Sequence, residues 1–449
     1  MNNCLVLKFG GTQLKDASSV RTACNLIASV YEKEKPSLLP IIVSAPGKIN
    51  DGILGVKVTD LLERIYSNDN IDVNLREVKN RFKSLASGLE LNLDFLESPL
   101  CSFEKNILDN VSEKKENKDR TYSAICGFGE MIQSEIVGRF FDLAFNSLPN
   151  CWLNFNEFGM ITDKYRDADV LSESLPTIEK KLSGLEGIVF LPGFVGCNSR
   201  GELTTLGRDG SNYTATKIAE ALLAKEVRIY SDEPGVRRAN PLLVPDAEII
   251  SELTYEEARE FAELGAKIIN PRAITPAQNE NIPIYIVNEQ GNGTKIYSHI
   301  SLEHMGAKII ASVPNHRILT VHFKNNETGL LERISNEFKN AGLDIASISD
   351  EGHAVSLAFS GNGNLGKVLE GLKFDKYYLE NNLTRISLIG EGMRNQSGIL
   401  SKLAGCYADN GISIRMVSQA IPQLNITTFV NDKYERMAVR RLYDSFFRD

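Results

Sequence analysis

The chain has 449 residues, too many for one compact core, so roughly two to four domains are expected. Its 42% hydrophobic and 24% charged residues are ordinary for a globular protein, and a net charge of −8 without a long basic cluster argues against a nucleic-acid binder. Seven scattered cysteines without a C-x-x-C pair, no secretory segment and no apolar run of the ~20 residues that span a bilayer predict a cytoplasmic protein with reduced thiols and no membrane segment.

The first predicted element is a short buried strand that ends in a glycine turn. Residues 5–9 form the strand, Gly10 and Gly11 follow it, and apolar residues recur at helical spacing over residues 20–31. A glycine pair between strand and helix lets backbone N–H groups approach an anion, and Lys8 would place a positive charge beside it. By itself the turn fits equally well a glycine-rich turn that only packs.

Strands and helices alternate in the stretch that follows. Residues 38–44 and 188–191 are predicted to form buried strands, and residues 60–120 are predicted to form polar helices. The loop 204–212 carries a glycine and hydroxyl side chains and precedes a helix, which makes it a second candidate anion site. The order of strand, helix and strand predicts parallel α/β units.

The stretch ends with two strands that flank a capped helix. Residues 227–231 and 282–287 are predicted strands, and the first runs into a turn at residues 231–235. Thr254 and Glu257 predict a capping box at the start of the intervening helix.

The last third of the chain contains an internal repeat. Each copy has the predicted order β-α-β-β-α, a small sheet with helices on one side. The matched positions are Gly329 with Gly398, Ile334 with Leu403, Phe338 with Tyr407 and Gly342 with Gly411.

Ordered motifs along the whole chain resemble those of aspartate kinases. They are Lys8-Phe9-Gly10-Gly11-Thr12, Val43-Ser44-Ala45, Thr59-Asp60-Leu61-Leu62, Gly129-Glu130, Thr204-Thr205-Leu206-Gly207-Arg208, Tyr255-Glu256-Glu257-Ala258 and Gly265-Ala266-Lys267. The repeat resembles tandem ACT domains, the regulatory modules of that family. Because the sequence ends at the second module, it resembles the monofunctional enzyme and not the fusion with homoserine dehydrogenase.

The resemblance implies an architecture and an activity. It implies a three-layer αβα amino-acid kinase sandwich over residues 1–297 and ferredoxin-like ACT domains over 298–380 and 381–449. The implied reaction is ATP-dependent phosphorylation of the L-aspartate side-chain carboxylate to 4-phospho-L-aspartate, the first step of lysine, threonine and methionine synthesis. Family behaviour also implies a homodimer through the ACT domains and feedback by an amino acid, with lysine expected first and threonine second.

The implied chemistry needs positive charge and in-line positioning but no general base, because the acceptor carboxylate is already ionised. The resemblance assigns catalysis to Lys8, Gly10 and Gly11, with Mg²⁺ carried by ATP. It assigns substrate binding to Ser44, Thr59, Glu130, Arg208 and Ser211, where Arg208 would hold a carboxylate and Glu130 the ammonium. Taken singly, Glu130 and Arg208 are better explained as structural ion pairs.

Two further groups of residues follow from the resemblance. The nucleotide side would comprise Lys8, Gly10, Gly11, Ser231, Asp232 and Lys267. The regulatory amino acid would contact Gly329, Leu330, Asp344 and Ile345.

Departures from the family pattern leave two alternatives open. Asp209 and Asn212 stand where the family has glycine and aspartate, Asn240 replaces an aspartate, and Leu242 replaces an arginine. The chain is therefore either an aspartate kinase, a related enzyme with another amino-acid acceptor, or a non-catalytic pseudokinase subunit. Residues 361–366 match the glycine pattern of a dinucleotide-binding motif, but the acidic residue that would bind the ribose is missing. A simple strand-to-helix turn is therefore expected.

Overall fold

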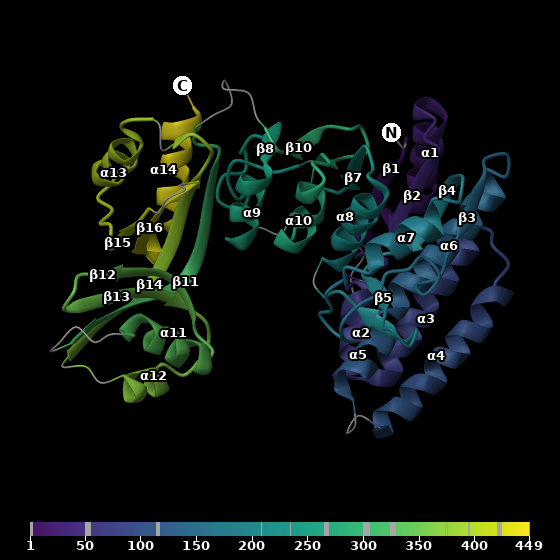
Figure 1. Ribbon diagram of the computed structural model, residues 1–449, viewed down its shortest axis with the longest axis horizontal. Helices are drawn as coiled ribbons and strands as arrows, with labels where there is room; N and C mark the ends of the chain where they lie inside the picture. The colour runs from purple at the N-terminus through teal and green to yellow at the C-terminus, as the bar shows by residue number, and fades with distance from the viewer. Residues whose placement is uncertain are drawn as a thin grey trace. The chain divides into compact units, whose positions relative to one another are not determined.

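The computed structural model describes residues 3–49, 55–113, 117–207, 209–233, 235–264, 269–299, 306–323, 329–372, 374, 376–393, 396–419 and 424–448. The chain forms two compact units. Figure 1 labels the helices and strands along the ribbon. Unit 1 comprises Met1–Val236, Ser251–Arg259 and Lys267–His299. Unit 2 comprises Arg237–Ile250, Glu260–Ala266 and Ile300–Asp449.

Unit 1 is built on an eight-stranded sheet with the order β3-β4-β2-β1-β7-β9-β10-β8. The strands are β1 (Leu5–Phe9), β2 (Leu38–Val43), β3 (Asn150–Trp152), β4 (Gly187–Pro192), β7 (Glu226–Tyr230), β8 (Glu252–Thr254), β9 (Ile284–Val287) and β10 (Gly293–Tyr297). The six strands from β3 to β9 are parallel, and β10 pairs antiparallel with β9. β5 (Val195–Cys197) and β6 (Leu203–Thr205) form a separate antiparallel pair.

Helices cover both faces of this sheet, which gives the predicted three-layer αβα sandwich. The helices in this part of the chain are α1 (Ala17–Glu34), α2 (Val58–Tyr66), α3 (Ile71–Gly88), α4 (Asp94–Glu113), α5 (Lys118–Cys126), α6 (Phe128–Ala144), α7 (Ser174–Leu182), α8 (Gly210–Leu222), α9 (Tyr255–Glu263) and α10 (Pro271–Asn279), and the last four residues of α9 belong to unit 2. Leu5, Leu7 and Phe9 pack in one core with side chains of α1, α3 and α6. Because side chains alternate along a strand, Val6 and Lys8 point to the other face, where α8 lies on β1, β2 and β7.

Local signals in the sequence explain several element ends. The backbone N–H of Thr254 donates to Glu257 Oε2 at 2.9 Å, and the N–H of Glu257 donates to Thr254 Oγ1 at 3.2 Å, so the predicted capping box is confirmed. Asp16 caps α1 by accepting from the N–H of Ser19 at 2.8 Å.

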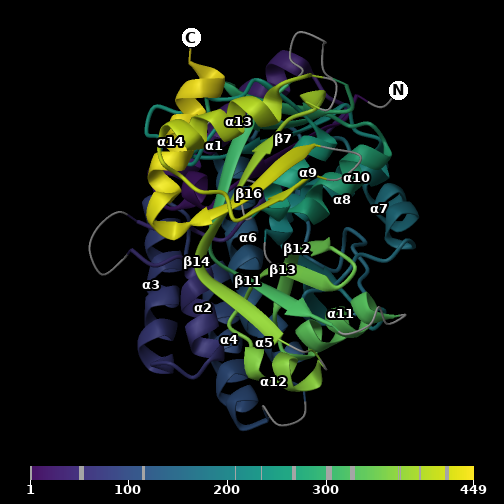
Figure 2. The same ribbon diagram turned by 90° about the vertical axis from the view of Figure 1, so that its left-hand side faces the viewer.

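Unit 2 contains one curved antiparallel sheet with the order β12-β13-β11-β14-β16-β15, which Figure 2 shows face-on. Its strands are β11 (Ile309–His322), β12 (Asp344–Asp350), β13 (Ala354–Ser360), β14 (Lys376–Ile389), β15 (Met416–Ser418) and β16 (Asn425–Asn431). Its helices are α11 (Leu330–Asn340), α12 (Leu365–Gly371), α13 (Ile399–Asp409) and α14 (Glu435–Phe447). The element order confirms β-α-β-β-α in both copies of the repeat.

Each copy of the repeat has its own hydrophobic core, and the long strands β11 and β14 run along the sheet from one copy to the other. Leu319 in β11 belongs to the core of the first copy with Ile334 and Phe338, whereas Ile310 in the same strand belongs to the core of the second with Leu403. The N-terminal half of β11 thus completes the second module, although it precedes the first in sequence. The predicted residue limits of the domains stay predictions.

The stretch 361–366 is a packed turn between β13 and α12. Gly361 has φ +106°, and a Cβ on Gly363 would lie 2.0 Å from the carbonyl oxygen of Ala341. Glycine is therefore required here for close backbone packing.

Candidate functional site

The candidate site is a cavity of about 610 Å³ at the carboxyl ends of the parallel strands of unit 1. Strand β1 contributes Lys8, the segment after β2 contributes Ser44, and α8 contributes Ser211 near its N-terminus. Ligands of open α/β sheets bind at this edge, because loops and helix N-termini converge there.

Six of the predicted site residues surround this single cavity. They are Lys8, Gly11, Ser44, Thr59, Glu130 and Ser211. They come from five separate stretches of the sequence, so only the tertiary fold brings them together. Arg208 and Lys267 lie outside the described residues.

Gly10 and Gly11, which follow β1, have different structural roles. The N–H of Gly10 donates to the carbonyl of Tyr230 at 3.3 Å, and a Cβ on Gly10 would lie 3.6 Å from Lys8 Nζ. A Cβ on Gly11 would lie 2.7 Å from the carbonyl oxygen of Ala45. Gly10 thus leaves room beside the Lys8 ammonium, and Gly11 lets two backbone segments touch.

Lys8 is a buried ammonium whose charge is opposed by its surroundings. The pKa of Lys8 is lowered to about 8, chiefly by burial and to a smaller extent by the charge of Lys57. Asp209, Asp232 and Glu130 act in the opposite direction and favour the charged form. A lysine in this setting suits the binding of a polyanion, since added negative charge restores its proton.

Glu130 is the second buried charge in the cavity. Burial raises the pKa of Glu130 to about 8, although the backbone N–H of Ala45 and the charge of Lys8 both oppose the shift. Its Oε2 accepts no hydrogen bond from any described residue. A buried acceptor without a partner is costly, so the site is prepared for a ligand that donates hydrogen bonds or carries positive charge.

The N-terminus of α8 forms another wall of the cavity. Asp209 precedes the helix with φ +56°, and its side chain does not cap the helix. Asn212 lines the cavity, and its Oδ1 is buried and accepts no hydrogen bond from any described residue. This wall therefore presents one exposed carboxylate and one unsatisfied amide oxygen to a ligand.

The predicted nucleotide-side residues Ser231 and Asp232 follow β7 and do not line this cavity. The N–H of Ser231 donates to the carbonyl of Val287 at 3.0 Å. With its side-chain amide oriented to satisfy both neighbours, Gln13 donates to the carbonyl of Tyr230 at 3.2 Å and accepts from the N–H of Asp232 at 2.9 Å. Gln13 thus connects the turn after β1 to the turn after β7.

The stretch that follows Ser231 and Asp232 belongs to unit 2 from Arg237 to Ile250. Arg237 donates to the carbonyl of Ala247 at 2.7 Å, and Arg238 forms an ion pair of 3.3 Å with Glu248. Both arginines therefore have partners inside unit 2.

Several cavity residues were missed by sequence reasoning. Arg166 stacks its guanidinium 4.0 Å above the ring of Tyr122, and both line the cavity with Lys57 and Phe194. Phe194 has a φ of +67°. A phenylalanine in the sequence gives no indication of this left-handed backbone conformation. In the sequence, only the position of Lys57 two residues before Thr59 could have indicated that it lines the cavity.

The predicted regulatory residues lie at two element starts in unit 2. Gly329 precedes α11 with φ +80°, Leu330 begins α11, and Asp344 and Ile345 begin β12. Leu330 and Ile345 both pack against the core of the first module.

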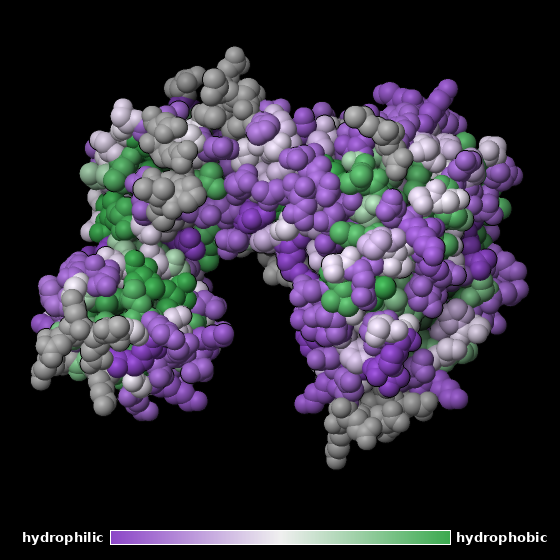
Figure 3. All heavy atoms as spheres, viewed as in Figure 1, coloured by the Kyte–Doolittle hydropathy of each residue, from purple (hydrophilic) through white to green (hydrophobic). Residues whose placement is uncertain are grey.

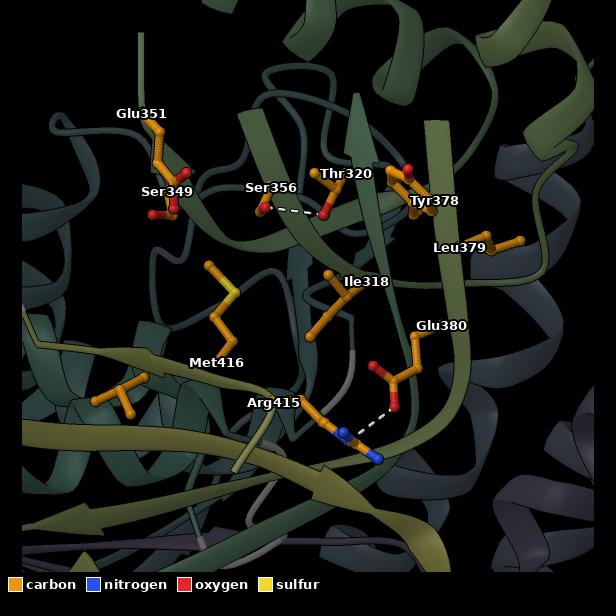
Figure 4. Close-up of a pocket in the computed structure, with 11 residues that line it drawn as sticks. Ile318, Thr320, Ser349, Glu351, Ser356, Tyr378, Leu379, Glu380, Arg415 and Met416 are labelled. Atoms are coloured by element: carbon orange, nitrogen blue, oxygen red, sulfur yellow. Dashed lines mark hydrogen bonds and ion pairs between the residues drawn. The ribbon is translucent and has the colours of Figure 1, made fainter. Parts of the chain in front are cut away.

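A cavity of about 600 Å³ occurs elsewhere in unit 2, on the sheet, and is shown in Figure 4. The ion pair between Arg415 and Glu380, 2.9 Å long, lies on one side of it, and the hydrogen bond between Thr320 and Ser356, 2.9 Å long, lies on the other. None of the four predicted regulatory residues lines this cavity.

Two other kinds of site are absent from the part of the chain that the structure describes. No group of three or more His, Cys, Asp or Glu side chains is placed to hold a metal ion. No described helix is both long and apolar enough to cross a membrane.

Comparison with known proteins gives consistent family matches. Residues 3–288 match the amino acid kinase family, and residues 386–446 match the ACT domain. The aspartokinase of Pseudomonas aeruginosa is 30% identical over 278 residues, which cover 58% of this chain and 67% of that protein. Aspartokinase 2, chloroplastic, of Arabidopsis thaliana is 27% identical over 469 residues, which cover 98% of this chain and 84% of that protein.

Solved structures show the same fold. Escherichia coli aspartokinase III in complex with aspartate and ADP has a TM-score of 0.79 at 22% identity, covering 99% of this chain and 100% of that one. The same enzyme in complex with lysine and aspartate has a TM-score of 0.76 at 21% identity, with the same coverage.

Proposed function

Because this chain belongs to the amino acid kinase family, and within it to the aspartokinases, we propose that it transfers the γ-phosphoryl group of ATP to the side-chain carboxylate of L-aspartate. The product is 4-phospho-L-aspartate, and the reaction is the first step of lysine, threonine and methionine synthesis. The single observation that carries the proposal is that one cavity is lined both by buried Lys8 and by Glu130, whose buried Oε2 accepts no hydrogen bond from any described residue.

Lys8 supplies the positive charge that the transferred phosphoryl group requires. The acceptor carboxylate attacks phosphorus without losing a proton, so stabilisation of charge on the phosphoryl oxygens is the main demand on the protein. The carboxylates of Asp209 and Asp232 favour the charged form of Lys8. Because Lys8 is buried, its charge acts more strongly on a bound phosphoryl group than it would in water.

Glu130 and the neighbouring walls would orient the acceptor amino acid. The unpartnered Oε2 of Glu130 accepts the α-ammonium of aspartate, and Arg208 binds its α-carboxylate. Ser44, Thr59 and Ser211 line the same cavity and contribute hydroxyl groups. These assignments place the side-chain carboxylate of the substrate toward Lys8.

The nucleotide would bind on the side of β1 and β7. We assign its phosphates to Lys8, Gly10 and Gly11, and its remaining contacts to Ser231, Asp232 and Lys267. Since the N–H of Gly10 donates to Tyr230, Gly10 contributes space and not an amide donor. Mg²⁺ enters with the nucleotide, where it neutralises phosphate charge.

Unit 2 would regulate the reaction by binding an end-product amino acid, with lysine the first candidate and threonine the second. We assign the contacts to Gly329, Leu330, Asp344 and Ile345. The chain would act in the cytoplasm as a homodimer through its ACT modules. Figure 3 shows hydrophobic residues gathered on part of the visible face of unit 2. Ile348, Leu379 and Val417 are large exposed side chains on the sheet of unit 2 that a partner copy would cover.

The test is acyl-phosphate formation, trapped with hydroxylamine, from the purified full chain with Mg-ATP and L-aspartate. Glutamate and asparagine serve as alternative acceptors. We expect product with aspartate, loss of at least a hundredfold in kcat in Lys8→Ala, and unchanged activity in Lys181→Ala, which alters an exposed lysine on α7. Product with another acceptor only would change the substrate, and ATP binding without any product would identify a pseudokinase.

Regulation is tested in the same assay. Lysine and threonine are added separately to the wild type, Asp344→Ala and Arg415→Ala. Relief of inhibition in Asp344→Ala alone supports the assigned contacts. Relief in Arg415→Ala alone would move the effector to the cavity of Figure 4.

A further inference from the structure

Arg81 is a buried cation that the proposed chemistry does not use. It lies on α3, is only 7% exposed, and does not line the cavity. Its Nη2 donates to the carbonyl of Gly47 at 2.6 Å, and its Nη1 donates to the carbonyl of Val56 at 2.5 Å. These two carbonyls lie on either side of residues 48–55, so one guanidinium holds both ends of the segment that connects β2 to α2.

Keeping this charge buried is costly. Burial lowers the pKa of Arg81, and the charge of Glu77 on the same helix only partly opposes that effect. No ion pair joins Arg81 to any described carboxylate, and its Nε has no hydrogen-bond partner among the described residues. A planar guanidinium reaches two acceptors in a fixed geometry, which an ammonium group does not reproduce. The energetic cost of burying this guanidinium is explained if the cavity requires a fixed distance between the carbonyls of Gly47 and Val56.

The two held ends form one wall of the cavity. The N–H of Gly47 donates to the carbonyl of Gly11 at 2.8 Å, and the N–H of Val58 donates to the carbonyl of Pro46 at 3.2 Å. The N–H of Ala45 binds the Glu130 carboxylate. The cavity residues that this wall supplies are Ser44, Ala45, Gly47, Lys57, Thr59 and Asp60.

We propose that Arg81 is a positioning residue for the acceptor amino acid: by holding the carbonyls of Gly47 and Val56, it sets the distance between Thr59 and Glu130 across the cavity. This role rests on the proposed function. It predicts a larger effect on aspartate than on ATP, because the wall carries Ser44 and Thr59 of the acceptor side, touches the nucleotide side through Gly11, and does not include Ser231 or Asp232. Weakening the clamp, by which we mean the two hydrogen bonds from Arg81 to the carbonyls of Gly47 and Val56, should therefore raise the KM for aspartate and leave the KM for ATP nearly unchanged.

The experiment compares Arg81→Lys, Arg81→Ala and Arg76→Ala in the full chain. Arg76 is an exposed arginine on the same helix and serves as the matched control. We expect the KM for aspartate to rise at least tenfold in both Arg81 variants, with less than a threefold change in the KM for ATP and none in Arg76→Ala. Added methylguanidinium should restore at least part of the aspartate affinity of Arg81→Ala, and faster amide exchange should be confined to residues 45–59.

The proposal would be overturned if the KM values for aspartate and for ATP rose equally, in proportion to the loss of melting temperature, and if methylguanidinium did not restore aspartate affinity. Arg81 would then be a structural residue. If neither Arg81 variant folds, Gly47→Ala replaces them, since its Cβ would lie 2.6 Å from the backbone of Gly11 and must displace the same wall. An unchanged KM for aspartate in that variant would also overturn the proposal. Failure of the wild type to phosphorylate aspartate would refute the proposed function instead, and amide exchange at residues 45–59 would then test the clamp alone.

Discussion

Lys8 and Glu130 are opposite charges in one cavity, and burial outweighs their mutual attraction at both residues. Each favours the charged form of the other, yet the pKa of Lys8 falls to about 8 and that of Glu130 rises to about 8. Burial therefore disfavours the ionised form of both side chains in the ligand-free protein. Binding a zwitterion and a polyanion supplies the missing opposite charges, so substrate binding and ionisation are coupled.

The first prediction concerns the pH dependence of aspartate use. Because aspartate binds to ionised Glu130, kcat/KM for aspartate should fall about tenfold per pH unit below pH 8. Above that pH, loss of the Lys8 proton should lower it again. Glu130→Gln should raise the KM for aspartate and remove the acid limb. A flat profile between pH 6 and 8 in the wild type would contradict the assignment.

The second prediction concerns stability at the same residue. An unfolded Glu130 loses its proton near pH 4.5, whereas the folded protein retains it until about pH 8, so raising the pH between these values favours unfolding. Glu130→Gln should therefore stabilise the protein by on the order of a few kcal/mol at pH 8 and by nothing at pH 4. Denaturant unfolding at both pH values measures the difference. An equal gain at both would show that burial of the charge is not the cause.

The third prediction compares the two glycines after β1. Gly11→Ala forces a Cβ to within 2.7 Å of the Ala45 carbonyl, and backbone must move, so we expect a loss of about 1–3 kcal/mol in stability and a large loss of activity. Gly10→Ala meets the flexible side chain of Gln13 at 3.0 Å and should cost less stability. Melting temperature and kcat of both variants test this order, which the reverse ranking would refute.

The fourth prediction concerns the regulatory unit. Phe338 is fully buried and packs edge-to-face on Phe359, with ring centroids 5.1 Å apart. Phe338→Ala should destabilise the first module by about 3–5 kcal/mol and reduce feedback inhibition while aspartate turnover persists. Leu331→Ala, at a position 44% exposed on the same helix, is the control. Normal inhibition in Phe338→Ala would show that effector binding does not depend on this core.

The fifth prediction concerns the unsatisfied amide of Asn212. A carboxylate introduced by Asn212→Asp would favour the charged form of Lys8 and shift the alkaline limb of kcat upward by roughly one pH unit. Asn212→Leu removes the polar group without adding charge and should leave the alkaline limb of the pH profile of kcat unchanged. Identical limbs in both variants would mean that residue 212 does not act on Lys8.

The sequence by itself determined the features that depend on local pattern. Helical and strand periodicity predicted parallel α/β units and the repeated cores around Phe338 and Tyr407, because burial of one face imposes a period that can be read directly. The Thr254 and Glu257 pair predicted the capping box, and the family resemblance implied the three-layer sandwich. Short ordered motifs also predicted six residues that surround one cavity.

The tertiary structure alone decided what depends on distant contacts. The passage of β11 from one module core to the other, the membership of Arg237–Ile250 in unit 2, and the clamp from Arg81 to Gly47 and Val56 involve partners far apart in sequence. The opposite pKa shifts of Lys8 and Glu130 likewise have no signature in composition or spacing. Desolvation and backbone hydrogen bonding are properties of the assembled fold, so residue order alone does not specify them.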